Sequence, residues 1–192
     1  DDKDAATRIL EAAERLLAEV GHDGMSMQAV ADAAGVNKAS VFYYFSGKTA
    51  LVERVLERYY AQHLAALSGA FEREGSLRER LHGLVDAYLD FIEQNRSYPR
   101  LVQQQLVGSA EHAELIRTSL GQLFDWTLKS LEGIATGRGA SAARQLFVTF
   151  SGIVINYYTI APLLAERWGD DPLGPEGLAE RRAHVHWIVD TL

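Results

Sequence analysis

The side chains between Asn37 and Lys48 are of the kinds that bind phosphate groups and base edges. Lys38 and Lys48 carry ammonium groups, while Tyr43 and Tyr44 each combine a hydroxyl group with an aromatic face. A lysine binds phosphate oxygens as a point charge, and a tyrosine can donate to a phosphate while its ring packs on a thymine methyl group. These residue types predict a surface that contacts a nucleic acid.

Several neighbouring residues fit this surface less directly. Ser40 is short and reaches DNA only if its helix lies deep in a groove, and Gln28 fits either a pairing with adenine or an ordinary solvated helix position. Ser26 is better suited to capping its helix than to touching DNA, although one oxygen can do both. Lys48 is expected near the start of a long helix, where free backbone N–H groups also attract phosphate. The predicted DNA-contacting residues are Ser26, Gln28, Asn37, Lys38, Ala39, Ser40, Tyr43, Tyr44 and Lys48.

The charge pattern supports this surface only locally. The chain has 192 residues and a formal net charge of −7, which argues against general binding to nucleic acid. Residues 1–60 contain seven Lys or Arg and ten Asp or Glu, yet residues 33–52 contain two lysines and no acid. An acid-free window in an acidic chain indicates a small phosphate-contacting surface.

Two short helices are expected to present these residues. Gly35 lies between segments predicted as helices over 27–34 and 38–44, which Ser26 and Asn37 can cap. Small alanines let the two helices approach closely, and Gly35 permits the backbone conformation of a sharp turn. This pattern is typical of a helix-turn-helix, whose second helix enters the major groove of DNA.

Three runs of residues between positions 8 and 56 occur in a fixed order. Arg8 precedes Ile9-Leu10-Glu11-Ala12-Ala13, residues 30–36 read Val-Ala-Asp-Ala-Ala-Gly-Val, and residues 37–45 read Asn-Lys-Ala-Ser-Val-Phe-Tyr-Tyr-Phe. In this register residues 8–56 resemble the TetR family of bacterial transcriptional regulators, with its first helix and its Ile-Ala-x-x-Ala-Gly-Val and Ser-Lys-Gly-x-Leu-Tyr-x-Tyr-Phe patterns. Each element alone is a weak signal, but together they are highly specific.

Two positions depart from the family pattern. Phe42 stands where the family usually has tyrosine, so a phosphate hydrogen bond is absent there. Ala39 stands where glycine or proline is usual, which alters the approach to the bases. The operator sequence of a relative therefore cannot be transferred to this chain.

The fold is predicted to be all-α, because almost every apolar run has helical spacing and no strand pattern is found. We expect about nine helices, the short ones first and long antiparallel ones after. Ser46 is expected to cap the fourth helix, a capping box of Ser76 and Glu79 to start the fifth, and the seventh to end near Gly137. The resemblance implies a three-helix DNA-binding domain over residues 1–47 and a larger helical ligand-binding and dimerisation domain over residues 48–192.

The segment 141–169 is expected to form a helix that is apolar on most sides. Its stretch from Gln145 to Ala165 carries no charge and approaches the length that spans a bilayer, but polar residues and Pro162 interrupt it. We therefore expect a helix buried in a soluble assembly and no membrane partner. A single subunit is not expected to bury all of this apolar surface. The resemblance implies that the last two helices pair in a homodimer. The predicted interface residues are Phe150, Ile153, Tyr157, Leu164, Val185, Ile188 and Val189.

A ligand pocket is expected among the fifth, sixth, seventh and eighth helices, where apolar walls mix with scattered polar groups. Each of the candidate residues fits a plain core position equally well. They are Tyr88, Phe91, Gln104, Leu123, Trp126, Phe147 and Asn156.

Enzyme motifs are lacking. Glu79 and His82 have the spacing of a carboxylate-bridged metal bundle, but that site needs a second such pair, which the chain does not contain. His184 and His186 are two residues apart and point to different sides of a helix. There is no cysteine, phosphate-binding glycine loop or nucleophile elbow. We expect neither enzymatic activity nor a bound metal or cofactor.

Three hypotheses follow. The first is a cytoplasmic regulator, a repressor that binds a near-palindromic DNA operator as a homodimer and is released by a small, largely apolar effector. The second is an architectural or chromosome-associated DNA-binding factor of the same fold without an inducer. The third, which the sequence supports least, is a helical metal-dependent oxygenase.

Overall fold

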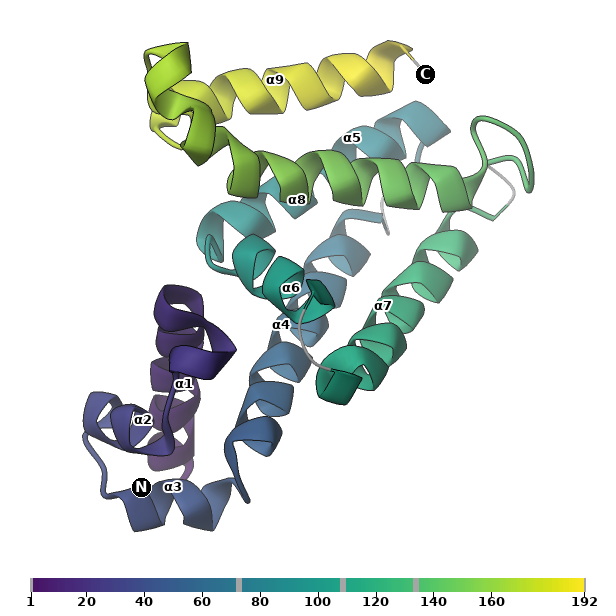
Figure 1. The fold of residues 1–192 in the computed structure, drawn as a ribbon. Helices are drawn as coiled ribbons and strands as arrows, with labels where there is room; N and C mark the ends of the chain where they lie inside the picture. Colours follow the sequence, from purple (N-terminus) through teal and green to yellow (C-terminus); the bar gives the residue numbers. More distant parts are fainter. Residues whose placement is uncertain (1, 72–73, 108–109, 133–134, 192) are drawn as a thin grey trace. The chain divides into compact units, whose positions relative to one another are not determined.

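The computed structural model describes residues 2–71, 74–107, 110–132 and 135–191, and these ranges are almost entirely helical (Figure 1). They contain no strand, and a single isolated bridge joins Thr136 and Ala142. The all-α prediction is confirmed. The helices in these ranges are α1 (Asp2–Gly24), α2 (Met27–Ala34), α3 (Lys38–Tyr44), α4 (Lys48–Phe71), α5 (Leu77–Gln94), α6 (Tyr98–Val107), α7 (Ala110–Ser130), α8 (Ala143–Trp168) and α9 (Pro175–Thr191).

The chain divides into two compact units. The first contains residues 1–61 and 100–119, and the second contains residues 62–99 and 120–192. The helix α4 therefore contributes residues to both units. The functional boundary expected between residues 47 and 48 lies within the first unit and remains a prediction.

In the first unit, α1 supplies the apolar face on which α2 and α3 pack. Ile9, Ala13 and Leu17 are fully buried, and their spacing places them on one side of α1. Tyr59 of α4 is also buried, and its hydroxyl donates to the Glu14 carboxylate at 2.7 Å. The regular part of α1 ends at Gly21, whose positive φ of 72° produces a kink. This small core holds the short helices that follow.

In the second unit, α5 packs against α9. A capping box starts α5, in which the Ser76 hydroxyl accepts from the Glu79 N–H and the Glu79 carboxylate accepts from the Ser76 N–H. This predicted cap is confirmed. Both helices bury apolar residues, including Leu81, Val85 and Leu89 of α5 and Val185 and Val189 of α9.

Two predicted helix ends were wrong. We expected Ser46 to cap the fourth helix, but α4 begins at Lys48, and the Leu51 N–H donates to the Gly47 carbonyl at 3.0 Å. The seventh helix was expected to reach Gly137, but α7 ends at Ser130. As a result of the first correction, Lys48 is the first residue of its helix.

Candidate DNA-binding surface

A left-handed turn at Gly35 joins α2 to α3. Gly35 has φ 66° and ψ 37°, and its N–H donates to the Asp32 carbonyl at 3.3 Å. The Val36 N–H donates to the Ala31 carbonyl at 3.0 Å, which closes the end of α2. A residue with a Cβ atom adopts this conformation at a cost of roughly 1–2 kcal/mol. The turn thus fixes the direction in which α3 leaves α2.

Side-chain caps fix the starts of both helices. The Ser26 hydroxyl accepts from the Ala29 N–H at 3.1 Å, so the predicted cap of α2 is confirmed. The Asn37 Oδ1 atom accepts from the Ser40 N–H at 2.7 Å and from the Ser40 hydroxyl at 3.0 Å. The two predicted DNA contacts Asn37 and Ser40 are therefore joined to each other, and they define the first turn of α3.

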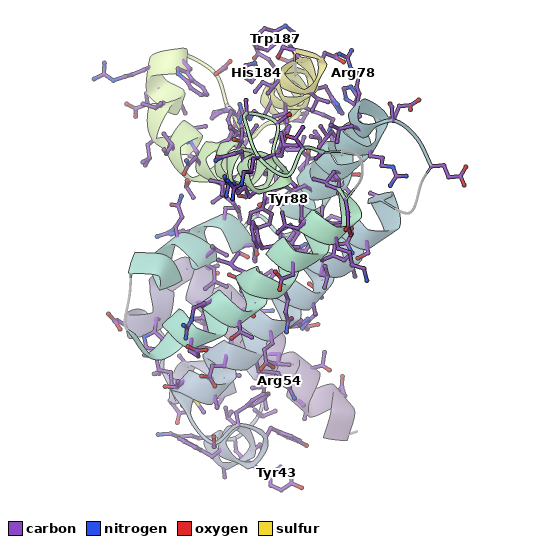
Figure 2. All side chains as sticks on the ribbon, turned by 90° about the vertical axis from the view of Figure 1, so that its right-hand side faces the viewer. Tyr43, Arg54, Arg78, Tyr88, His184 and Trp187 are labelled. Atoms are coloured by element: carbon purple, nitrogen blue, oxygen red, sulfur yellow. The ribbon has the colours of Figure 1, made fainter. Side chains whose placement is uncertain are left out.

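The outer face of α3 carries exposed side chains suited to DNA. Val41 is fully buried on the inner side, whereas the Tyr43 residue is 77% exposed and projects away from the ribbon (Figure 2). Tyr44 is half-buried and meets the Tyr43 ring edge to face, with centroids 5.0 Å apart. Lys38 is exposed, and its Nζ atom lies 6.0 Å from the centroid of the exposed Phe42 ring. The structure therefore divides α3 into an apolar inner side and an aromatic and cationic outer side.

The neighbouring helices add two polar groups. Lys48 is half-buried in the first turn of α4, which contains no acidic residue, so the partial positive charge of this helix end is uncompensated locally. Gln28 is exposed on α2, and its amide donates to the Asp32 carboxylate at 2.8 Å. An exposed pair of this kind is easily exchanged for a base or phosphate partner.

Among the predicted pocket residues, Tyr88 and Phe91 lie together around a buried histidine. The His63 ring stacks on Tyr88 and Phe91 with centroid distances of 4.6 and 4.8 Å. Its Nδ1 atom lies 3.3 Å from the Tyr98 hydroxyl, and its Nε2 atom has no partner among the described atoms. Burial lowers the pKa of His63 to about 3, so the ring is neutral. No sequence motif marks His63, because its partners come from other helices.

The other pocket candidates are more scattered. Leu123 is buried, Trp126 is half-buried, and the Phe147 ring meets Phe124 edge to face at 5.2 Å. The side chain of Gln104 lies outside the described part of the chain. Phe91 also borders an open cleft of about 480 Å³ with Gln62, Asp90 and Gln94. Asn156 is exposed and lines a different groove, along α8.

The groove along α8 has a volume of about 500 Å³, and Ile153, Tyr157 and Leu164 of the predicted interface line it. Three apolar side chains of α8 and α9 are prominently exposed: Leu163 at 81%, Trp187 at 59% and Trp168, which lines this groove, at 51%. They were not predicted as interface residues. Within the described residues, α8 is the helix whose length and composition would allow it to cross a membrane.

The remaining predicted interface residues differ in exposure. Phe150 and Ile188 are half-buried, whereas Val185 and Val189 are buried within the single chain. The amphipathic pattern of the last helix does not indicate which of its apolar residues are buried within their own subunit. The exposed Trp187 marks the side of α9 that points outward (Figure 2).

Glu79 and His82, whose spacing is that of a carboxylate-bridged metal bundle, bind separate partners. The Glu79 carboxylate accepts from the Ser76 N–H and hydroxyl at 2.8 Å each, and these bonds lower the pKa of Glu79. His82 instead faces His186. In the ranges that the structure describes, no group of three or more His, Asp or Glu is placed to hold a metal ion.

The fold and this surface define a helix-turn-helix DNA-binding protein, and comparison with known proteins places it further. Residues 9–55 match the model of the bacterial regulatory proteins of the tetR family. The chain is 32% identical over 183 residues to the HTH-type transcriptional activator FasR of Mycolicibacterium smegmatis, covering 94% of this chain and 80% of FasR. The chain belongs to the TetR family of transcriptional regulators.

Two further similarities are more distant. The nucleoid occlusion factor SlmA of Haemophilus influenzae is 28% identical over 113 residues, covering 57% of this chain and 50% of SlmA. The crystal structure of the regulator FadR from Bacillus subtilis in complex with stearoyl-CoA superposes with a TM-score of 0.75 at 16% identity, covering 97% of this chain and 98% of FadR. At that identity, the superposition shows a shared fold.

The surface predicts a distinct salt dependence for Lys48. Lys48→Ala should weaken binding to all duplex sequences alike and reduce the slope of log K against log salt by about one unit, because one phosphate contact is lost. Fluorescence anisotropy with a duplex from upstream of the protein's own gene measures this slope. Lys129→Ala, in the last turn of α7, is the matched control and should leave the slope unchanged. An unchanged slope in Lys48→Ala would show that this lysine does not bind phosphate.

The buried histidine predicts acid lability. The unfolded chain takes up a proton at His63 below about pH 6.5, whereas the folded chain does so only near pH 3. The contribution of the neutral His63 ring to stability is therefore fully present above pH 6.5 and is lost on acidification. The free energy of unfolding should fall by up to about 1.4 kcal/mol per pH unit in this window through His63. Urea unfolding of His63→Phe should lack this contribution, while His184→Gln, at an exposed position, should retain it. Equal slopes in the wild type and His63→Phe would contradict the assignment.

Proposed function

We propose that this protein is a ligand-responsive repressor that binds a near-palindromic operator as a homodimer in the bacterial cytoplasm. The observation that carries the proposal is the outer face of α3, where Lys38 and Tyr43 are exposed and Tyr44 is half-buried, while Val41 is buried on the inner side. The proposed DNA contacts are these residues together with Ser26, Gln28, Asn37, Ala39, Ser40 and Lys48.

The exposed apolar side chains of α8 and α9 support dimerisation. Leu163, Trp168 and Trp187 are each more than half exposed, and Trp168 also lines the groove along α8. Large exposed apolar side chains of this kind are typical of interaction sites. A two-fold axis through α8 and α9 would present α3 twice. Recognition helices of a dimer enter successive major grooves when they are about 34–36 Å apart.

Buried aromatic residues with one unused polar atom support an effector site in the second unit. The neutral His63 ring between Tyr88 and Phe91 offers Nε2 to a ligand, and ligand sites combine apolar walls with few polar groups. The FadR crystal structure contains stearoyl-CoA, so a long-chain acyl-CoA is the effector class we propose. Only the acyl chain of this effector matches the small, largely apolar molecule expected from the sequence, since coenzyme A adds a large charged group.

Release from DNA would follow from a shift between two conformations. The effector can move this equilibrium only by its differential affinity for the two states, and a change from 1:99 to 99:1 needs about 10⁴-fold discrimination. The helix α4 would transmit the change, because it begins with Lys48 in the first unit and carries His63 in the second.

A second candidate is a chromosome-associated factor without an inducer, which the similarity to SlmA supports. Such a protein would bind many chromosomal sites and would not respond to acyl-CoA. The name of FasR assigns activation to that relative, so the direction of the transcriptional effect is part of the test.

The dimer predicts that one acidic substitution separates the subunits. Leu163→Glu should raise the dimer dissociation constant at least about tenfold, because it places a charge against an apolar face. Sedimentation velocity measures this constant, and operator affinity should fall with it. Val20→Glu makes the same change at an exposed valine of α1 and should leave the dimer intact. A Leu163→Glu protein that sediments like the wild type would exclude this interface.

The effector predicts release from DNA. Stearoyl-CoA should dissociate the complex with the upstream duplex in a gel shift, whereas coenzyme A alone should not. Dissociation supports the inducible repressor, and acyl-CoA that strengthens the complex would reverse the proposed sign. Stable binding to the duplex without any response to acyl-CoA would favour the chromosome-associated factor.

A further inference from the structure

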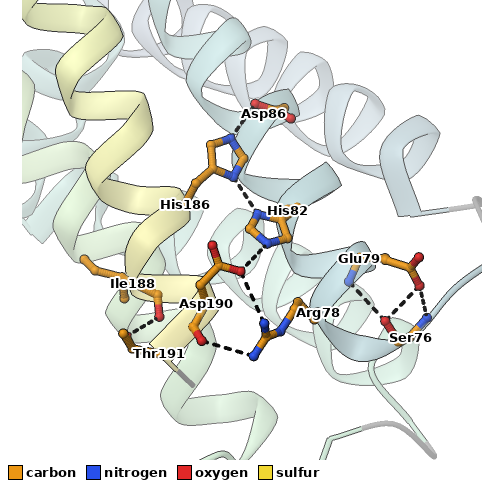
Figure 3. Close-up of polar contacts among 9 residues, drawn as sticks. All are labelled: Ser76, Arg78, Glu79, His82, Asp86, His186, Ile188, Asp190 and Thr191. Atoms are coloured by element: carbon orange, nitrogen blue, oxygen red, sulfur yellow. Dashed lines mark hydrogen bonds and ion pairs between the residues drawn. The ribbon is translucent and has the colours of Figure 1, made fainter.

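A chain of four side chains joins α5 to α9 in the second unit (Figure 3). The two histidines lie at its centre, with the Nδ1 atoms of His82 and His186 2.6 Å apart. At the outer ends, the His186 Nε2 atom lies 2.9 Å from the Asp86 carboxylate, and the His82 Nε2 atom lies 3.1 Å from the Asp190 carboxylate. Each histidine therefore binds the aspartate that the opposite helix carries four residues after its own histidine.

The hydrogen bonds among these four side chains require three ring protons, whereas two neutral histidines supply two. A carboxylate only accepts hydrogen bonds, so each Nε2 atom that faces Asp86 or Asp190 must carry a proton. The Nδ1 atom of a neutral ring is then a bare acceptor. Two neutral rings would thus direct two lone pairs at each other across 2.6 Å. One additional proton turns this repulsion into a short N–H···N hydrogen bond.

The surrounding charges favour that additional positive charge. Arg78 on α5 binds the Asp190 side chain and its carbonyl at 3.5 and 3.0 Å, and Arg182 on α9 binds Asp86 at 2.9 Å. Partial burial, the largest effect, raises the pKa of Asp86, but the hydrogen bonds from His186 and Arg182 together bring it below its usual value. Asp86 thus remains ionised beside the His186 ring. Arg182 also binds Asp90 and Glu93.

We propose that His82 and His186 share one proton and that this proton fastens α9 to α5 as a pH-responsive latch. The distance selects a proton over a divalent metal ion. Two nitrogen ligands at about 2.0–2.1 Å from a tetrahedral zinc ion lie about 3.3 Å apart, whereas the observed 2.6 Å fits a short hydrogen bond. The latch does not depend on the proposed repressor function.

A shared proton gives stability a maximum in pH. The folded latch holds one proton, and two free imidazoles in the unfolded chain together hold one near pH 6.5. At higher pH the unfolded chain binds fewer protons than the folded one, and stability falls as the pH rises. At lower pH it binds more, and stability falls as the pH falls. The contribution of the latch to the folding equilibrium constant should decline by up to about tenfold per pH unit on either side.

Urea unfolding from about pH 5 to about pH 8.5 tests the latch across this maximum. The ratio of the folding constants of the wild type and the double variant His82→Gln, His186→Gln should peak near pH 6.5. The matched control is His184→Gln, an exposed histidine on α9, which should give a flat ratio. A flat or monotonic ratio for the double variant would overturn the proposal.

Two measurements on the wild-type protein do not depend on the folding of a variant. Nitrogen-15 NMR of the histidine rings at about pH 7.5 should find three ring protons on His82 and His186 together, since two rings titrating as free imidazoles would mostly be neutral at that pH. Two neutral rings would overturn the latch. Calorimetric titration with zinc chloride should show no site that is lost in the double variant, and such a site would assign the pair to a metal instead.

Discussion

The left-handed backbone at Gly35 determines where the DNA-binding side chains point. With the Val36 N–H bound to the Ala31 carbonyl, α2 cannot continue, and the chain must enter α3 in one direction. Val30 before the turn and Val41 after it are both fully buried, so the inner sides of the two helices are fixed together. The outer side of α3 follows from this packing.

A helix of seven residues is not stable by itself, because the conformational entropy lost in forming its first turn outweighs its few hydrogen bonds. The helix α3 therefore depends on the Asn37 cap and on the burial of Val41. These contacts order Lys38, Tyr43 and Tyr44 before DNA is present, which lowers the conformational entropy lost on binding. Apolar residues and a cap thus position the polar residues that make contact.

Much of the first unit could be predicted because its signals are local. Caps at Ser26 and Asn37, the glycine at position 35 and the helical spacing of apolar residues each act within a few residues. The starts and ends of α2 and α3 agree with the sequence for this reason. The Ser46 cap failed because serine and glycine next to each other offered two possible starts, and the backbone of Gly47 took the position.

The second unit was harder to predict because its contacts join residues far apart in the sequence. The amphipathic pattern showed that Val185 and Val189 share a face with Ile188, but not that the two valines are buried within one chain. The His63 stack and the His82–His186 pair depend on contacts between helices. The His–Asp spacing of four residues on both helices was the available signal for that pair, and it has meaning only once α5 and α9 are known to be neighbours.

We propose that α3 is presented outward twice in one assembly, at a spacing that fits consecutive turns of a duplex. Hydroxyl-radical footprinting on the protein's own upstream DNA measures this spacing directly. We expect two protected stretches on the same face of the duplex, centred about 10–10.5 base pairs or a multiple of this apart. A single protected stretch, or two stretches on opposite faces, would contradict it.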